Sequence, residues 1–175
     1  YTVDPRNLGT VMETLAEIGG LLNADENAKK VVRKMQSRIT RVKTLVGKVS
    51  HRPRVFFQIG ISPIVSVGTP TFIHELILLA GGKNLTEGTV PYPRYSREKI
   101  LSFAPEVFII TSMARGEIFE KVKTQWQQWP DMPAVKNNRI FLVDSNILDR
   151  AAPRLVDGLE ALFRLFHPQL AEDIP

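Results

Sequence analysis

The segment Arg54-Val55-Phe56-Phe57-Gln58-Ile59-Gly60-Ile61 decides the fold. It is almost continuously apolar and lies between Pro53 and a glycine, which is typical of a strand buried on both faces of a parallel sheet. Two later stretches, 107–111 and 139–144, have the same character. We therefore predict three strands that belong to one sheet.

Amphipathic helical patterns alternate with these strands. Helices are predicted at about 69–80, 96–103, 117–126 and 153–166, and the first is expected to begin with Thr69 as its cap. Strands that alternate with such helices predict an α/β fold. The expected architecture is a three-layer αβα, Rossmann-like lobe with a mostly parallel sheet.

Two helices are predicted before the first strand. Residues 7–19 carry apolar side chains at helical spacing, and Gly19-Gly20 is expected to end that helix. A second helix is predicted from Asp25 to about residue 46–49, and about 22 helical residues span about 33 Å. This helix is long for a chain of 175 residues.

The composition is that of an ordinary globular domain. Hydrophobic residues make up 43% and charged residues 23%, which argues against wholesale disorder. The chain contains no cysteine, so disulfides, iron–sulfur clusters and a cysteine nucleophile are excluded. No apolar run approaches the ~18 residues expected of a membrane-spanning helix.

The net charge of +5 lies mainly in the first third of the chain. Residues 1–50 hold nine Lys or Arg against five Asp or Glu, and residues 51–175 hold fourteen against thirteen. The excess therefore belongs to the long helix. A solvated helix face explains it better than nucleic-acid binding does, because no aromatic side chains are interleaved for base stacking. We expect no nucleic-acid partner.

Known catalytic motifs are absent from the sequence. His74-Glu75 begins like a zinc-protease motif, but the fourth residue after the histidine is Leu78. No phosphate-binding loop, dinucleotide fingerprint or nucleophile elbow occurs. We expect no metal site, no catalytic residue and no enzymatic activity.

Three segments lie where a strand or loop runs into a helix: 55–61, 90–98 and 149–154. In an open α/β sheet, ligands bind at these junctions. Tyr92 stands between Pro91 and Pro93, which would hold its ring as a flat apolar wall. Gly60 would let the backbone approach a ligand closely.

Five blocks in this order resemble the C-terminal half of periplasmic substrate-binding proteins of the helical-linker class, which serve ABC importers of cobalamin, iron siderophores and haem. The blocks are Phe57-Gln58-Ile59-Gly60-Ile61, Ala80-Gly81-Gly82-Lys83-Asn84, Tyr92-Pro93, Ser96-Arg97-Glu98 and Arg150-Ala151-Ala152-Pro153-Arg154. The similarity is strongest to the members that bind cobalamin. It implies a solute-binding protein in which cobalamin or a related corrinoid is cargo and no further cofactor is held; haem or a ferric siderophore is the alternative.

The resemblance also implies roles for individual residues. The implied ligand-binding residues are Ile59, Gly60, Ile61, Tyr92, Pro93, Asp149 and Arg150. Asp149 would accept from an amide N–H and Arg150 would bind an amide oxygen or carboxylate. An anionic ligand would add Arg94 and Arg115. Glu98 would dock on the membrane permease.

The resemblance divides the chain into a remnant of an N-terminal lobe (1–23), a long interlobe helix (24–49) and a C-terminal substrate-binding lobe (50–175). The implied partners are an ABC permease with its ATPase, contacted peripherally at the membrane. The implied location is periplasmic or extracellular, with a membrane anchor if the N-terminus is lipidated. An isolated lobe would expose apolar cleft surface and is expected to self-associate. Rival hypotheses are a Rossmann-like enzyme domain and a nucleic-acid-binding module.

Overall fold

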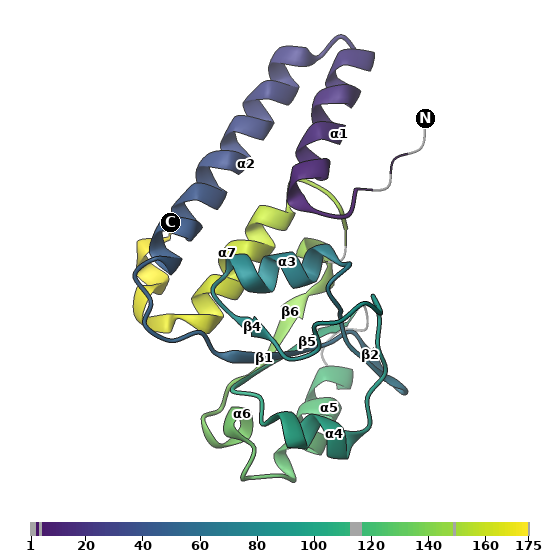
Figure 1. Cartoon of the computed structure of the whole chain (residues 1–175), viewed down its shortest axis with the longest axis vertical. Coiled ribbons are helices and arrows are strands. Elements are labelled where there is room, and N and C mark those ends of the chain that lie inside the picture. The colour runs from purple at the N-terminus through teal and green to yellow at the C-terminus, as the bar shows by residue number, and fades with distance from the viewer. Residues whose placement is uncertain (1–2, 4, 113–116, 149, 175) are drawn as a thin grey trace.

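The structure is a computed structural model that describes residues 3, 5–112, 117–148 and 150–174. After two N-terminal helices, one or more helices separate each strand of the central sheet from the next along the chain (Figure 1). The elements are α1 (Leu8–Leu21), α2 (Asp25–Val46), β1 (Arg54–Gln58), β2 (Gly60–Ile61), β3 (Ile64–Val65), α3 (Phe72–Leu79), β4 (Lys83–Asn84), α4 (Arg97–Phe103), β5 (Val107–Ser112), α5 (Glu117–Gln127), α6 (Pro133–Lys136), β6 (Ile140–Asp144) and α7 (Leu155–Phe166).

The central sheet has the order β4-β1-β5-β6, and all of its neighbouring strands are parallel. Phe57 of β1 pairs with Ile109 of β5, and Ser112 of β5 pairs with Asp144 of β6. The predicted α/β class and parallel sheet are confirmed. The edge strand β4 was not predicted, because its two residues are too few to show an alternating pattern.

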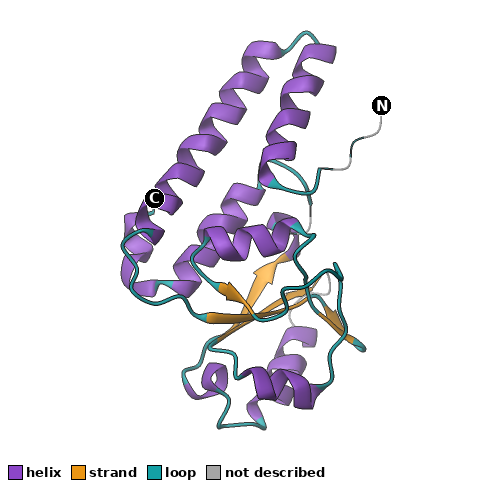
Figure 2. Ribbon diagram, in the orientation of Figure 1, coloured by secondary structure: helices purple, strands orange, loops and turns teal. Residues whose placement is uncertain are grey.

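Helices cover both faces of this sheet (Figure 2). Phe57 and Ile109 point into a core shared with α1, α2, α3 and α7. The alternate residues Phe56 and Phe108 point into a second core with α4, α5 and α6. Successive strand side chains face opposite ways, so a strand between two helical layers needs apolar side chains on both faces, as residues 55–57 of β1 provide.

The long helix α2 is confirmed at 22 residues, and α1 packs along it (Figure 1). The predicted end of α1 at Gly19-Gly20 is wrong, since the helix continues to Leu21. Gly19 serves helix packing instead: a Cβ there would collide with the Ala28 side chain of α2. The division of the chain into lobes stays a prediction.

An ion pair between the half-buried Arg38 and the buried Glu160 fastens α2 to α7. Arg38 donates from Nε to Glu160 Oε1 at 2.8 Å and from Nη2 to Glu160 Oε2 at 2.6 Å. The same Nη2 lies 2.7 Å from Asp157 Oδ1. These contacts, with the Glu160 hydrogen bonds foremost, raise the pKa of Arg38 above its ordinary value.

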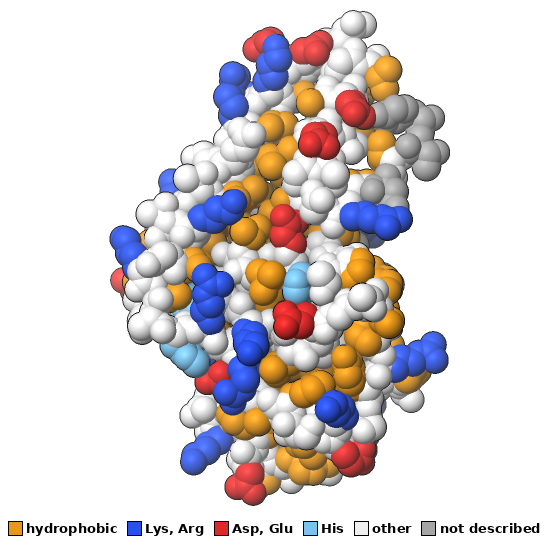
Figure 3. All heavy atoms as spheres, in the orientation of Figure 1, with side chains coloured by type: hydrophobic (Ala, Val, Ile, Leu, Met, Phe, Trp, Pro, Cys, Tyr) orange, Lys and Arg blue, Asp and Glu red, His pale blue; other side chains and the backbone are white. Residues whose placement is uncertain are grey.

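The remaining basic side chains of α2 lie on its exposed face, while hydrophobic side chains occupy the space between α1 and α2 (Figure 3). Lys29, for example, pairs with Glu26 one turn earlier, at 2.9 Å. Among the described residues, every helix is too short or too polar to cross a membrane.

The predicted start of α3 is two residues too early. Thr71 caps the helix, and its hydroxyl accepts from the His74 N–H at 3.2 Å. The Thr69 hydroxyl instead accepts from the Gly88 N–H at 3.0 Å. Thr69 therefore ties the turn before α3 to a later loop.

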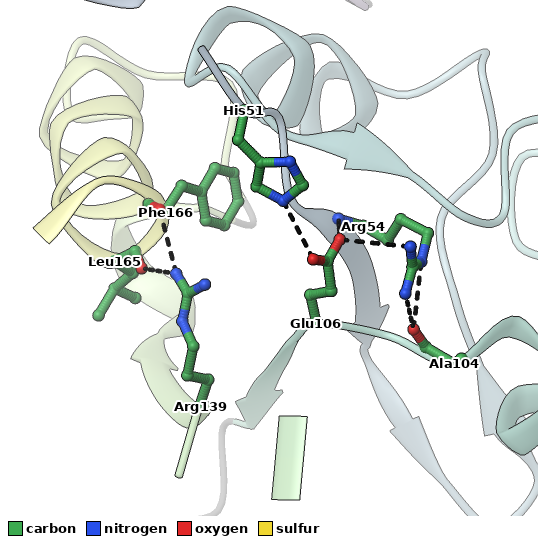
Figure 4. A network of polar contacts seen from close by, with 7 residues as sticks. All are labelled: His51, Arg54, Ala104, Glu106, Arg139, Leu165 and Phe166. Carbon is green, nitrogen blue, oxygen red and sulfur yellow. Dashed lines mark hydrogen bonds and ion pairs between the residues drawn. The ribbon is translucent and has the colours of Figure 1, made fainter. Parts of the chain in front are cut away.

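Polar side chains gather at the amino-terminal edge of the sheet (Figure 4). Glu106 accepts from the Arg54 N–H at 2.9 Å and from His51 Nε2 at 3.0 Å. Burial raises the pKa of Glu106, but the Arg54 hydrogen bond and the nearby positive charges outweigh it and lower the pKa. Arg139 donates to the carbonyls of Leu165 and Phe166 at the end of α7. These hydrogen bonds join the segment before β1 to the segment before β5, and the segment before β6 to the end of α7. They lie at the edge of the sheet opposite to the one where ligands are expected.

Candidate functional site

The parallel strands place the predicted junctions at one edge of the sheet. β1, β5 and β6 end at Gln58, Ser112 and Asp144, and their carboxyl ends share that edge. The hairpin after β1 and the segment after β6 therefore both start there. Segment 113–116, which contains Arg115, lies outside the described residues.

The hairpin β2–β3 begins directly after β1. Ile59 donates its N–H to the Val65 carbonyl at 2.9 Å, and Gly60 and Ile61 pair with Val65 and Ile64. A Cβ on Gly60 would lie 2.9 Å from the Val65 Cγ2 atom and 3.0 Å from the Pro63 carbonyl oxygen. Gly60 is thus needed for the close pairing of the hairpin itself.

Backbone hydrogen bonds join this hairpin to the loop that carries Tyr92. The N–H groups of Ser66 and Gly68 donate to the carbonyls of Pro93 and Pro91 at 2.9 and 2.8 Å. A Cβ on Gly68 would collide with the Val90 carbonyl oxygen, so the loop lies too close for any larger residue. Two of the three predicted junctions therefore form one continuous surface.

This surface exposes three large apolar side chains, Ile61, Val90 and Tyr92, which we call the apolar rim. Their exposed fractions are 39%, 57% and 53%. By contrast, Ile59 is half-buried and packs against the core, and Pro93 is also half-buried. Among the predicted residues of the first two junctions, Ile61 and Tyr92 thus have large exposed apolar side chains, and their ligand roles stay predictions.

A buried polar network supports the rim from below. Ser66 donates its hydroxyl to the Phe57 carbonyl at 2.7 Å and lies 2.8 Å from the Thr86 hydroxyl. The Thr86 N–H donates to Asn84 Oδ1, which fixes the orientation of that amide. Asn84 Nδ2 therefore donates to His74 Nδ1 at 3.0 Å, and this nitrogen of His74 carries no proton.

Burial lowers the pKa of His74, and the negative charge of Glu87 opposes this effect only in part. Burial also lowers the pKa of His167. Each histidine stays neutral in the fold at a pH where the unfolded chain, with a pKa of about 6.5, already binds a proton. The contribution of each neutral histidine to the free energy of unfolding is therefore fully present above about pH 6.5. It is lost as the pH falls below that value toward the lowered pKa of the folded state.

We expect the free energy of unfolding, measured in urea, to fall between pH 7 and 5.5 by at most about 1.4 kcal/mol per pH unit for each histidine. His74→Gln keeps an acceptor for Asn84 but cannot titrate. The fall should be shallower in this variant and not abolished, since His167 remains. An unchanged slope in His74→Gln would contradict this assignment.

The third junction is described only in part. Asp149 lies outside the described residues. Arg150 is exposed after the short 3₁₀ turn Ser145–Ile147, where the Asp144 side chain accepts from the Asn146 N–H at 2.9 Å. Arg94 is also exposed and its backbone bridges to Val65. The ligand roles predicted for these residues stay predictions.

Glu98 lies in the first turn of α4, which is capped by the Ser96 hydroxyl. A hydrogen bond with the Ser96 side chain lowers the pKa of Glu98, and the carboxylate is exposed. An ionised, outward-facing carboxylate is what docking on a cationic surface requires.

Sequence reasoning missed the residues that hold the site in place. Gln58 donates from Nε2 to the Gly60 carbonyl at 2.9 Å and accepts from Trp126 Nε1 at 3.2 Å. A glutamine inside an otherwise apolar strand was the available signal. Among the described residues, no group of three or more His, Asp or Glu could hold a metal ion.

Comparison with known proteins shows which family the chain belongs to. The family of periplasmic binding proteins matches residues 1–147. The chain belongs to this family. Its members are binding proteins, and this agrees with the expectation from the sequence.

Individual relatives are distant. An uncharacterised ABC transporter substrate-binding lipoprotein, YvrC of Bacillus subtilis, is 24% identical over 94% of this chain and 52% of its own length. The crystal structure of the periplasmic vitamin B12-binding protein BtuF of Vibrio cholerae matches with a TM-score of 0.83 and 22% identity, over 98% of this chain and 65% of that one.

The periplasmic heme-binding protein RhuT of Roseiflexus sp. RS-1 matches with a TM-score of 0.81 and 21% identity, over 94% of this chain and 65% of that one. These structures share the fold. The chain spans about half the length of the relatives that it matches in sequence.

Proposed function

We propose that this chain is the ligand-holding part of the solute-binding component of an ABC importer, and that its ligand is cobalamin or a related corrinoid. The observation that carries this proposal is the apolar rim. Hydrogen bonds fix Ile61, Val90 and Tyr92 in place at the carboxyl edge of a parallel sheet, where α/β proteins bind ligands. The protein binds and releases its ligand without changing it.

A corrin ring suits this surface because it presents a broad apolar body with polar arms. The ring of Tyr92 would stack on the body, and the neighbouring prolines limit the entropy lost on binding. Arg150 is exposed and follows β6 in the chain, and its guanidinium would meet a polar arm. The name of the Vibrio cholerae structure supports this ligand class.

Haem or a ferric siderophore is the second candidate. Its carboxylate or other anionic groups would engage the exposed Arg94 and Arg150. The name of the Roseiflexus structure supports it. Either ligand leaves the assignment to an importer unchanged.

A role in an ABC importer implies where the protein is located and which partners it contacts. We place it on the outer side of the cytoplasmic membrane, with a lipid anchor where its precursor carries one, as the name of the Bacillus subtilis relative suggests. Its partners are a permease and the ATPase of that permease. Glu98 would contact cationic side chains of the permease.

Uptake of ligand tests this proposal. Vesicles that contain the matching permease and ATPase are supplied with wild-type protein, with Glu98→Lys, or with Glu120→Lys on the exposed face of α5. We expect Glu98→Lys to lower uptake at least about tenfold, because a like charge at a docking site repels the permease. Its ligand affinity should not change. Equal uptake with both variants would contradict the docking role of Glu98, and no uptake with wild-type protein would contradict the importer function.

A further inference from the structure

The long helix α2 carries the net charge of the whole chain. It holds seven Lys or Arg against two Asp or Glu, while the rest of the chain holds sixteen of each kind. Both acidic residues lie in its first turn. Every charged side chain that follows in the helix, over residues 27–46, is positive. Such a concentration of one charge favours an anionic partner.

Three of these cations form a line along the exposed side of α2. Lys30, Lys34 and Arg41 are spaced by four and seven residues, which places them within about 40° of one another around the helix and over about 16 Å of its length. All three are exposed. The buried side chains of Met35 and Ile39 lie on the other side of the helix, so the line points away from the core.

Two hollows connect this line with the start of α7. The first has a volume of about 520 Å³, and its lining consists of Lys34, Ser37, Arg38, Arg41 and Glu160. The second, of about 310 Å³, shares Lys34 and Arg38 with the first and adds the exposed Arg154. We call the four exposed cations along the line and the hollows the basic face: Lys30, Lys34, Arg41 and Arg154.

The charges of the basic face are available to a partner. Within the part of the chain that the structure describes, their side chains form no hydrogen bond and no ion pair. The carboxylates nearby are already engaged. Glu160 and Asp157 both contact Arg38, and Glu26 pairs with Lys29. The basic face therefore keeps its positive charge for contacts outside the chain.

The form of the basic face suits a flat anionic surface better than a folded partner. None of the described residues that line the two hollows is aromatic. A protein interface uses aromatic side chains as anchors, and single-stranded nucleic acid stacks its bases on them. Long cationic side chains along a straight helix can instead each meet a separate headgroup of a lipid surface.

We propose that the basic face binds the anionic phospholipid surface of a membrane. Phosphate headgroups lie along α2, and those that enter the first hollow meet Lys34, Arg41 and the Ser37 hydroxyl. The central sheet separates α2 from α4, which carries Glu98. We therefore assign the lipid contact to the protein before it docks on its permease. The contact does not depend on which ligand is bound.

Vesicle binding tests this inference with a control of equal charge. The protein, expressed from its whole gene without lipid modification, is sedimented with vesicles of phosphatidylcholine alone or of phosphatidylcholine mixed with phosphatidylglycerol. The test variant combines Lys30→Gln, Lys34→Gln and Arg41→Gln. The control variant combines Lys83→Gln, Lys121→Gln and Lys136→Gln, which removes three exposed cations elsewhere.

We expect the wild type to bind the mixed vesicles and not phosphatidylcholine alone, and to bind more weakly as salt rises. The test variant should bind the mixed vesicles at least about tenfold more weakly, since each Lys or Arg near an anionic surface strengthens binding severalfold. The control variant should stay within about twofold of the wild type, because its three cations lie away from the basic face. Circular dichroism checks that both variants are folded.

Three results would overturn the lipid contact. The wild type could fail to prefer the mixed vesicles, or the test and control variants could lose binding equally. The third is displacement by inorganic phosphate beyond that by chloride at equal ionic strength, which would indicate a site for a free anion. The test variant should bind ligand as the wild type does, so each of these results would leave the proposed function standing.

Discussion

Replacing Arg38 by Ala is expected to lower the free energy of unfolding by about 3 kcal/mol, because Glu160 would remain buried without its cation. The exposed fraction of Glu160 is only 6%, and both of its carboxylate oxygens bond to Arg38. The variant also loses the bond from α2 to Asp157. Urea unfolding followed by circular dichroism measures the change.

Two further variants separate charge from packing at this position. The double variant Arg38→Met with Glu160→Met removes both charges and should regain most of the lost stability, since two apolar side chains replace a buried ion pair at little cost. Lys29→Met breaks an exposed pair within α2 and should change nothing measurable. A loss as small in Arg38→Ala as in Lys29→Met would contradict the role given to this ion pair.

Replacing Tyr92 by Ala is expected to weaken ligand binding about 30-fold or more, as for an aromatic residue at the centre of a binding surface. The ring is 53% exposed in the free protein, so its removal should leave the fold stable. Affinity is measured by titration with the ligand, and stability is measured in parallel.

Tyr92→Phe keeps the ring and is expected to bind within a few-fold of the wild type. Val90→Ala trims a neighbouring rim residue and should have a smaller effect than Tyr92→Ala. If Tyr92→Ala bound as tightly as Tyr92→Phe, the ligand would not lie on the rim.

The elements that the sequence predicts well are those with a long or strongly apolar pattern. β1 and α2 appear where expected, because a strand with four buried residues out of five and a helix of 22 residues leave clear patterns in the sequence. The two-residue strands β2, β3 and β4 leave none. Gly19 shows a second limit: a glycine pair signals a helix end, but here Gly19 lies inside α1, where only a glycine leaves room for the Ala28 side chain of α2.

The candidate site was predictable where a local motif marks it and not where contacts are long-range. Tyr92 is conspicuous between two prolines. The bonds that place it join residues more than twenty positions apart, such as Gly68 to Pro91, and no local pattern contains them.

The most direct test of a macrocycle-binding rim is a titration of the protein, expressed from its whole gene, with cobalamin and separately with hemin, followed by visible absorbance. We expect cobalamin to bind with a dissociation constant of about 1 µM or lower, which corresponds to about −8 kcal/mol. Binding of hemin alone would keep the rim and change the ligand. Binding of neither compound would contradict a macrocycle-binding rim and leave a ferric siderophore as the candidate ligand.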